Sequence, residues 1–259
     1  MATATKGGSL WASDVHGALV IVKKNARLYY LKSPVLIFGV LFPIFFFLTF
    51  LLGRGPGGLD ADAIVPGMLA MALWFTASAV GPLVTPWERR ARTYERLIST
   101  PISLKAIVCG DVFSGFIFGL GFSMVPVLLG RILTGARVSA FPLAAGGVVL
   151  GALAFSALGV LLAAPPVSSP SHIMMLSNLV RLPLLFLSGI FIPIAQMPAW
   201  ARWLAPLSPL SYAADLIRRG YGQAGYFPPW LDFTALLAFA VLLVAASCWF
   251  HRRTRAKGL

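Results

Sequence analysis

The sequence predicts an all-α, polytopic membrane protein. Hydrophobic residues make up 58% of the 259 positions, and the mean hydropathy of +0.85 is too high for a soluble domain to cover with polar surface. Several apolar segments reach the ~20 residues that a helix needs to cross ~30 Å of hydrocarbon. The fold class therefore follows from composition and segment length.

The net charge of +13 has a simple explanation in a membrane protein. Lys and Arg gather on the cytoplasmic side of the spans, where they meet anionic headgroups, so the charge does not indicate nucleic-acid binding. The two cysteines, Cys109 and Cys248, are expected at cytoplasmic span ends and argue against a disulfide framework or a cysteine metal site. Basic residues interrupt the N-terminal segment before any long apolar run, so no signal peptide is expected.

The N-terminal segments are expected to lie outside the hydrocarbon. Residues 1–8 suit a disordered tail, and residues 9–32 suit an amphipathic helix in the membrane interface. Basic residues fall off an apolar stripe that includes Trp and Tyr, which is typical of interfacial helices. The stripe comprises Trp11, Val15, Ala18, Leu19, Val22, Ala26 and Tyr29. The alternative is an ordinary solvated helix packed on a partner.

Residues 33–251 are expected to form a bundle of six transmembrane helices. The expected spans are Pro34–Leu52, Ile64–Thr85, Leu104–Gly130, Phe141–Ala163, Ser171–Ile194 and Leu231–Phe250. Of the 21 Lys and Arg residues, 14 lie on the side of the two termini and six on the other side, while Arg181 falls inside the fifth span. The positive-inside rule therefore places both termini, with the basic tail 252–259, in the cytoplasm.

The longest strongly polar run between spans is Pro86–Ala106. As a helix it carries Glu and Arg residues at a spacing that lets unlike charges pair. Its apolar stripe comprises Trp87, Ala91, Tyr94 and Ile98. Pro101 should end this helix and Ser103 can cap the next one. A short charged helix between two spans is typical of a docking element for a soluble partner.

The segment before the last span is expected to form a short helical hairpin. Prolines at six positions between 193 and 229 exclude a single straight helix. Pro198 can start one short helix. Ser208 and Pro209 can cap and start another, which Gly220 can end. Apolar side chains suit a hairpin that dips into the outer leaflet; they are Trp200, Trp203, Leu204, Leu207 and Tyr212.

The fifth expected span carries a charge, because Arg181 lies ~15 Å along the helix that begins at Ser171. An Arg at mid-membrane costs ~2.5–3.5 kcal/mol on insertion scales and usually faces the bundle interior or a watery cavity. The candidate substrate-path residues on this face are Ser177, Asn178, Arg181 and Ser188. The alternative is a span that begins later, so that the Arg181 side chain extends to the cytoplasmic surface.

Two blocks of sequence resemble a known family. RRARTYERLISTPISLKAIVCGD is similar to the cytoplasmic loop of type 2 ABC exporters, with Thr-x-Glu-Arg-Leu followed by Thr-Pro. LFLSGIFIPIAQMPAWARWLAPLSPLSYAADLIR is similar to the family's Phe-x-Ser-Gly-x-Phe-x-Pro segment, its Pro-Leu-Ser/Thr-Tyr turn and its final Asp-x-x-Arg. The chain therefore resembles the transmembrane (permease) subunit of these drug, lipid and polysaccharide exporters. It departs from the pattern at Arg92, Asp111 and Ser208, where the family often has Gly, Lys and Asn.

The resemblance implies an ATP-driven exporter with two membrane subunits (a second copy of this chain or a related permease) and two ABC ATPase subunits. ATP and Mg would be bound by the ATPase, because no Walker-type Gly-x-x-x-x-Gly-Lys-Ser/Thr motif occurs here and the chain is not expected to be an enzyme. The loop helix would be a coupling helix in an ATPase cleft, with candidate coupling residues Thr93, Tyr94, Glu95, Arg96, Leu97 and Pro101. The alternative is a solvated loop whose charge only fixes topology.

The substrate class stays open at this point. The Trp- and Leu-rich external segment favours export of a hydrophobic drug-like molecule or a lipid across the cell (inner) membrane, with a polysaccharide or lipid-linked glycan as the alternative. From other classes, a membrane-embedded lipid-modifying enzyme or a passive scramblase remains open. The histidines lack metal-ligand spacing, and Ser123 lacks the second glycine of a hydrolase elbow. Asp111 is expected to face headgroups or to pair with Lys105 or Arg96.

Overall fold

The computed structural model describes residues 7–27, 61–91, 103–165 and 169–256, with positions 41, 44–45 and 48–49 between the first two ranges. Every regular element in this part of the chain is a helix, which confirms the all-α class. Five of the helices are long and apolar enough to cross a membrane. Most of the expected first span lies outside the described residues, and so does most of the expected N-terminal tail.

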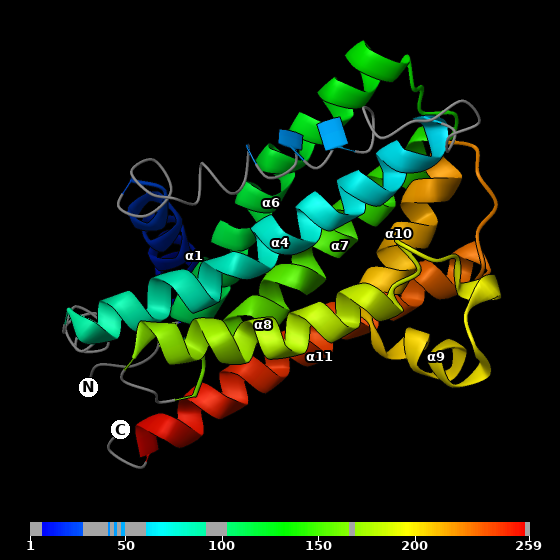
Figure 1. Ribbon diagram of the computed structural model, residues 1–259. Helices are drawn as coiled ribbons and strands as arrows, with labels where there is room; N and C mark the ends of the chain where they lie inside the picture. Colours follow the sequence, from blue (N-terminus) through cyan, green and yellow to red (C-terminus); the bar gives the residue numbers. More distant parts are fainter. Residues whose placement is uncertain are drawn as a thin grey trace, which may run out of the picture.

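The span-length helices pack side by side and alternate in direction along the chain (Figure 1). They are α4 (Ala61–Arg90), α6 (Leu104–Thr134), α7 (Phe141–Leu162), α8 (Pro170–Leu187) and α11 (Pro229–Ala256). Helix α1 (Gly7–Asn25) lies against α6 at the end of the bundle where α4 and α11 finish and α8 starts. We call this end the α1 end. The opposite end, where α6 finishes and α7 starts, is the α10 end.

Helix α4 is longer than the second expected span, because it continues through Pro86 to Arg90. Trp87 and Glu88 therefore belong to α4 and not to a separate loop helix, and that part of the prediction is wrong. Prolines inside a buried helix are tolerated when neighbouring helices compensate for the lost hydrogen bonds. Most of α4 is covered by other helices, and it contains further prolines at positions 66 and 82.

Glycines with a left-handed backbone end two of the other helices. Gly135, at φ 70°, caps α6, and Gly189, at φ 81°, follows α8, which stops at Leu187, before the expected end at Ile194. Such φ values favour glycine because it has no Cβ atom. The start of α6 agrees with the prediction, since Ser103 accepts a hydrogen bond at Oγ from the Ala106 amide at 3.1 Å.

Small residues allow α4, α6 and α7 to cross closely. A Cβ atom on Gly81 of α4 would lie against the carbonyl oxygen of Gly159 of α7, and one on Gly159 would lie against the carbonyl oxygen of Ser78. A Cβ atom on Gly119 of α6 would lie 2.6 Å from the Cβ atom of Ala77. Such crossings are typical of helix packing in membranes, where close backbone approach replaces the hydrophobic effect as the source of stability.

The predicted hairpin is present at the α10 end. It consists of η3 (Ile194–Gln196), α9 (Ala199–Leu204), η4 (Ala205–Leu207) and α10 (Pro209–Gly220). Pro198 precedes α9, Pro209 starts α10 and Gly220 is the last residue of α10, as predicted. The Ser208 hydroxyl does not cap α10 and instead donates to the Leu184 carbonyl at 3.0 Å.

The two short helices of the hairpin have different surroundings. Trp200 and Trp203 of α9 are 65% and 83% exposed, which suits contact with lipid. Helix α10 packs against α4, α7 and α11, and its Leu216 and Tyr212 are buried. Tyr212 is therefore a core residue and not the interfacial aromatic that was expected.

Helix α1 turns part of its predicted apolar stripe outward. Val15 and Leu19 are exposed, whereas Ile21 is buried against α6, where a Cβ atom on Gly110 would lie 2.8 Å from the Ile21 Cβ atom. An outward apolar face with Lys23 beside it suits a helix in the membrane interface. Tyr29, at the end of the predicted stripe, lies outside the described residues.

Candidate functional site

The predicted docking element connects α4 to α6 at the α1 end. Helix α4 ends at Arg90 and α6 begins at Leu104, so the flanks of the connection are held by two helices of the bundle. The candidate coupling residues lie outside the described residues; they are Thr93, Tyr94, Glu95, Arg96, Leu97 and Pro101. What the structure shows is how the base of the connection is held.

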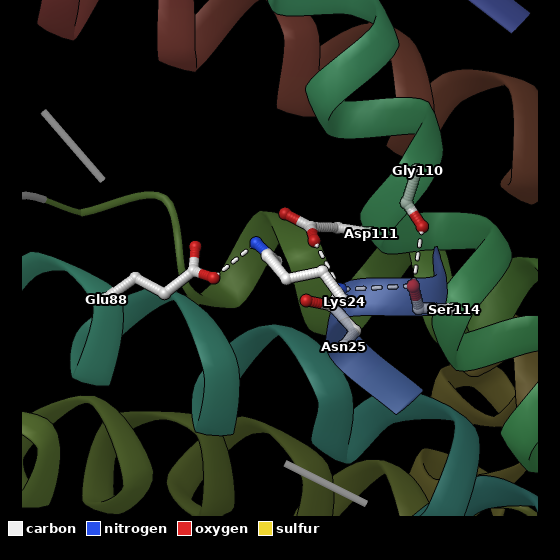
Figure 2. A network of polar contacts seen from close by, with 6 residues as sticks. All are labelled: Lys24, Asn25, Glu88, Gly110, Asp111 and Ser114. Carbon is white, nitrogen blue, oxygen red and sulfur yellow. Dashed lines mark hydrogen bonds and ion pairs between the residues drawn. The ribbon is translucent and has the colours of Figure 1, made fainter. Parts of the chain in front are cut away.

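A polar cluster joins three helices at this base (Figure 2). Lys24 of α1 forms an ion pair with Glu88 of α4. The next residue, Asn25, donates from Nδ2 to Oδ1 of Asp111 at 2.9 Å and to Oγ of Ser114 at 3.1 Å, both on α6. Ser114 in turn donates to the Gly110 carbonyl at 2.8 Å. One turn of α1 therefore contacts the last turns of α4 and the first turns of α6.

The cluster is buried although it carries charge. Asn25 is fully buried, and Glu88 and Asp111 are 4% and 6% exposed. Buried charges are tolerated when they are paired and hydrogen-bonded, and Lys24 interacts electrostatically with Asp111 as well as Glu88. Because removal of one partner leaves another charge uncompensated, the groups should stabilise one relative position of α1, α4 and α6.

Asp111 is thus not a headgroup-facing residue, and that expectation is wrong. Its hydrogen-bond donor is Asn25, whereas Lys105, one of its two expected partners, is exposed. Arg96, the other expected partner, lies outside the described residues. Residues 86 positions apart in sequence form this contact, and no local pattern indicates it. The only sequence signal is an acidic residue early in an apolar span.

Arg89 fixes the neighbouring corner of the bundle. Its guanidinium donates from Nη1 to the Pro165 carbonyl at 2.6 Å and from Nη2 to the Ala164 carbonyl at 3.2 Å, just after α7 ends. A cation is favourable at carbonyl groups that the end of a helix leaves without partners. The end of α4 is therefore tied to α7 as well as to α1.

The candidate substrate-path face of α8 lies mainly against α4. Arg181 is 3% exposed. It donates from Nη2 to the Phe75 carbonyl at 3.0 Å, and its guanidinium lies 5.1 Å from the centroid of the Phe75 ring. Phe75 is in the middle of α4, so the Arg181 side chain does not extend to the α1 end as the alternative interpretation required. Ser177 is also buried on this face, whereas Asn178 is exposed.

Two polar atoms of this face have no partner among the described residues: Oγ of Ser177 and Nε of Arg181. Ser188, at the end of the face, donates to the Leu185 carbonyl at 2.6 Å. A buried polar atom without a partner is unfavourable. In this conformation Ser177, Arg181 and Ser188 are therefore buried, and the Ser177 hydroxyl and the Arg181 Nε–H group could each form a further hydrogen bond.

Other chemistry is not gathered into a site in the described part of the chain. His16 and His172 are exposed, and Nδ1 of His251 lies 2.8 Å from the Ser247 carbonyl. No group of three or more His, Cys, Asp or Glu residues there is placed to hold a metal ion. The Ser123 hydroxyl donates to the Leu120 carbonyl of its own helix, which fits a packing role.

Comparison with known proteins adds a family match over this region. The model of the ABC-2 type transporter family matches residues 17–221, from α1 to the end of α10. Nodulation protein J of Rhizobium leguminosarum bv. trifolii is 30% identical over 226 residues, which cover 83% of each chain. The inner membrane transport permease YadH of Escherichia coli (strain K12) is 26% identical over 245 residues, which cover 93% of this chain and 92% of that protein.

Proposed function

The chain belongs to the ABC-2 type transporter family, and on that basis we propose that it is the membrane subunit of an ATP-driven exporter. ATP and Mg would be bound, and ATP hydrolysed, by a separate ABC ATPase subunit, because the sequence contains no Walker-type motif. The chain then acts as a transport component rather than an enzyme. We place it in the inner membrane, as the name of the similar E. coli permease states for that protein.

The observation that carries the proposal is the position of the α4–α6 connection. Helix α4 ends at Arg90 and α6 begins at Leu104, both at the α1 end and within the region that matches the family. We assign the ATPase contact to this connection. The residues concerned are Thr93, Tyr94, Glu95, Arg96, Leu97 and Pro101. Charged groups there can pair with the ATPase, while the Tyr and Leu side chains supply apolar contact area.

The polar cluster supplies the stiffness that such a contact requires. A push on the connection acts on α4 and α6 together, and Lys24 and Asn25 extend the stiff unit to α1. Closure of the ATPase subunits would then move these helices as a rigid body and open an outward path between two membrane subunits.

We propose that both termini and the α4–α6 connection are cytoplasmic. Described basic residues at the α1 end are Lys23, Lys24, Arg27, Arg89, Arg90, Lys105, Arg252 and Arg253. Those at the α10 end are Arg131, Arg137, Arg202, Arg218 and Arg219. The larger group marks the cytoplasmic side by the positive-inside rule.

A second membrane subunit and the surrounding lipids are the partners that we expect within the membrane. Much of the apolar surface of α8 and α11 is not covered by the described residues, and we expect it to face lipid or another subunit. That subunit would be a second copy of the chain or a related permease. We favour a hydrophobic drug-like molecule or a lipid as substrate because α9 exposes large apolar side chains such as Trp203; a polysaccharide or lipid-linked glycan is the alternative.

Within the chain, we propose that α8 contributes to the substrate path. The residues concerned are Ser177, Asn178, Arg181 and Ser188. Separation of α8 from α4 would release the Arg181 guanidinium from the Phe75 carbonyl and expose the unpartnered Ser177 hydroxyl. A guanidinium pairs well with phosphate, so an anionic headgroup is the ligand that this face fits.

The test is association with an ATPase and its dependence on Glu95. An affinity-tagged chain, purified from its native membrane, should bring down an ABC ATPase. Glu95→Lys should reduce that association while expression and membrane insertion stay normal, because unlike charges at a desolvated contact become like charges. The matched control is Asp60→Lys, the same reversal in the loop expected on the opposite side. Normal ATPase recovery with Glu95→Lys, or an equal loss with Asp60→Lys, would reject the assignment.

A further inference from the structure

A buried carboxyl group near the α10 end accepts no hydrogen bond from a donor in the described part of the chain. Asp232 lies in the first turn of α11 and is 0% exposed. Among the described residues, no donor reaches either of its side-chain oxygens, and no Lys, Arg or His nitrogen of that part of the chain forms an ion pair with it. An ionised carboxylate in this position lacks water, and among the described residues it has no hydrogen-bond donor and no direct ion pair, which is unfavourable.

A second carboxyl group lies beside it. Asp215 of α10 interacts with Asp232 through its side chain. Unlike Asp232, Asp215 is well stabilised as an anion: its Oδ1 accepts from the Tyr226 amide at 2.8 Å and its Oδ2 accepts from the Phe227 amide at 3.0 Å. The Arg219 Nε atom lies 3.6 Å from Oδ2. The two neighbouring acids therefore have opposite environments.

The surrounding cations make their hydrogen bonds to backbone carbonyls, and Arg219 also forms an ion pair with Asp215. Among the described residues, the charged and titratable side chains that interact with this acid pair are Tyr212, Arg218 and Arg219, all on α10. The Arg218 guanidinium donates to the carbonyls of Gly189 and Ile190, and Arg219 donates to the Phe227 carbonyl. The Tyr212 hydroxyl donates to the Pro206 carbonyl at 3.1 Å. Helix α7, which packs against both α10 and α11, has no titratable side chain.

From this geometry we propose that Asp232 and Asp215 form a proton-binding site, in which Asp232 carries the proton and donates a hydrogen bond to the ionised Asp215. The proton comes from water at the α10 end, and the O–H group of Asp232 is the only covalent bond that forms. A metal ion is a poor alternative, since Asp232 is inaccessible and the described residues contain no group of three or more metal-binding side chains. The site is independent of the proposed transport function.

Loss of this proton should weaken the junction between α10 and α11. Two ionised carboxylates would then repel each other, and Asp215 is also the acceptor that holds the amides of Tyr226 and Phe227. The folded chain is then most stable at low pH, and its stability falls as the pH rises through the range in which Asp232 loses its proton.

The first test measures thermal unfolding of the full chain in lipid nanodiscs from about pH 5 to about pH 9, the range in which buried carboxyl groups titrate. The wild-type chain should lose stability with rising pH, with the unfolding equilibrium constant increasing up to about tenfold per pH unit. Asp232→Asn keeps a donor toward Asp215 but cannot ionise, so that part of the pH dependence should disappear. Asp60→Asn, the same change in the segment expected to connect the first two spans, should retain it. An unchanged pH dependence in Asp232→Asn overturns the proposal.

The second test needs no variant and therefore does not depend on whether Asp232→Asn folds. Hydrogen exchange is followed in the wild-type chain over the same pH range, after correction for intrinsic exchange. Amides of residues 223–227 should lose protection at alkaline pH, whereas those of α7 should not. Equal protection of both segments at all pH values overturns the proposal, and neither test requires an ATPase or a transported substrate.

Discussion

Asn25 forms side-chain hydrogen bonds from α1 to α6. It is fully buried, and its side-chain amide is the donor to the carboxylate of Asp111. Water cannot replace that donor, because Asp111 is itself buried. The pair therefore has more effect on stability than an exposed hydrogen bond would have.

Replacement of Asn25 by Leu should destabilise the chain by about 1–3 kcal/mol, the cost of leaving a buried acceptor without its donor. The measurement is thermal or denaturant unfolding in detergent. The control is Asn178→Leu, the same change at an exposed position on α8, which should change stability little. If the two variants are equally stable, the buried hydrogen bond is not what holds α1 on α6.

A substitution at Arg181 should affect transport without lowering the stability of the folded chain. Arg181→Leu should leave the folded chain as stable as before or more stable, because apolar replacement of a buried charge is often neutral or stabilising. If Arg181 meets anionic headgroups during transport, the variant should lose stimulation of the associated ATPase by phosphatidylglycerol in liposomes, and Arg181→Lys should keep part of it. Arg131→Leu, at an exposed position of α6, should behave as wild type. Retained stimulation in Arg181→Leu would remove this face from the path.

The hydrogen-bond and ion-pair partners of individual residues are the feature that the sequence predicts least well. Lys24 and Glu88 are separated by 64 positions, and helical spacing relates only residues within a few turns. The sequence therefore places Glu88 on a charged face of a local helix, and only the packing of α1 across α4 and α6 shows its contact with Lys24. The burial of Arg181 was more predictable, since a charge inside an apolar span has few favourable environments.

At the scale of the element, local chemistry predicts starts and stops well. Ser103, Pro198 and Gly220 act at the positions that their backbone and capping preferences indicate. The prediction fails where tertiary packing overrides a local signal: α4 continues through Pro86 because other helices surround it. Local sequence chemistry does not predict the burial of α10 for a similar reason. Its length and its arginines resemble those of an interfacial helix.

The crossing of α4 and α7 gives an element-scale prediction. Gly159→Ala should destabilise the chain by about 1–3 kcal/mol, because the new methyl group meets the backbone of Ser78, which cannot move aside as a side chain could. The control is Gly121→Ala on α6, where a Cβ atom has no neighbour within 4 Å; this change should be neutral or mildly stabilising through helix propensity. Equal unfolding midpoints for Gly159→Ala and Gly121→Ala would mean that the backbones of α4 and α7 are not in close contact at this crossing.

At the scale of the whole molecule, composition predicts the class and segment length predicts the spans, but neither predicts which helix is central. The α10 segment is too short to be recognised as part of the membrane core, yet it packs against three long helices. The arrangement arises from contacts between small residues far apart in sequence, such as Gly220 with Ala144. A single sequence does not show which distant residues form such contacts.

Topology gives the whole-molecule prediction. After replacement of Cys109 and Cys248, single cysteines are introduced by Gly58→Cys, Thr93→Cys, Ala224→Cys and Thr254→Cys. An impermeant thiol reagent outside intact cells should label only Gly58→Cys and Ala224→Cys, because the positive-inside rule places the other two in the cytoplasm. All four sites should react after the membrane is permeabilised. Labelling of Thr93→Cys in intact cells would reverse the proposed orientation.

The length of α10 also matters for biosynthesis. With 12 residues, at 1.5 Å per residue, it measures ~18 Å, well short of the ~30 Å of hydrocarbon. It therefore cannot be released into the bilayer by the translocon as an independent segment. It must wait until α4 and α7 have assembled and α11 has been synthesised, since these helices provide its surroundings. We therefore expect α10 to dock after the last span has been translated, and a ribosome-stalled chain that lacks α11 should leave α10 open to proteases.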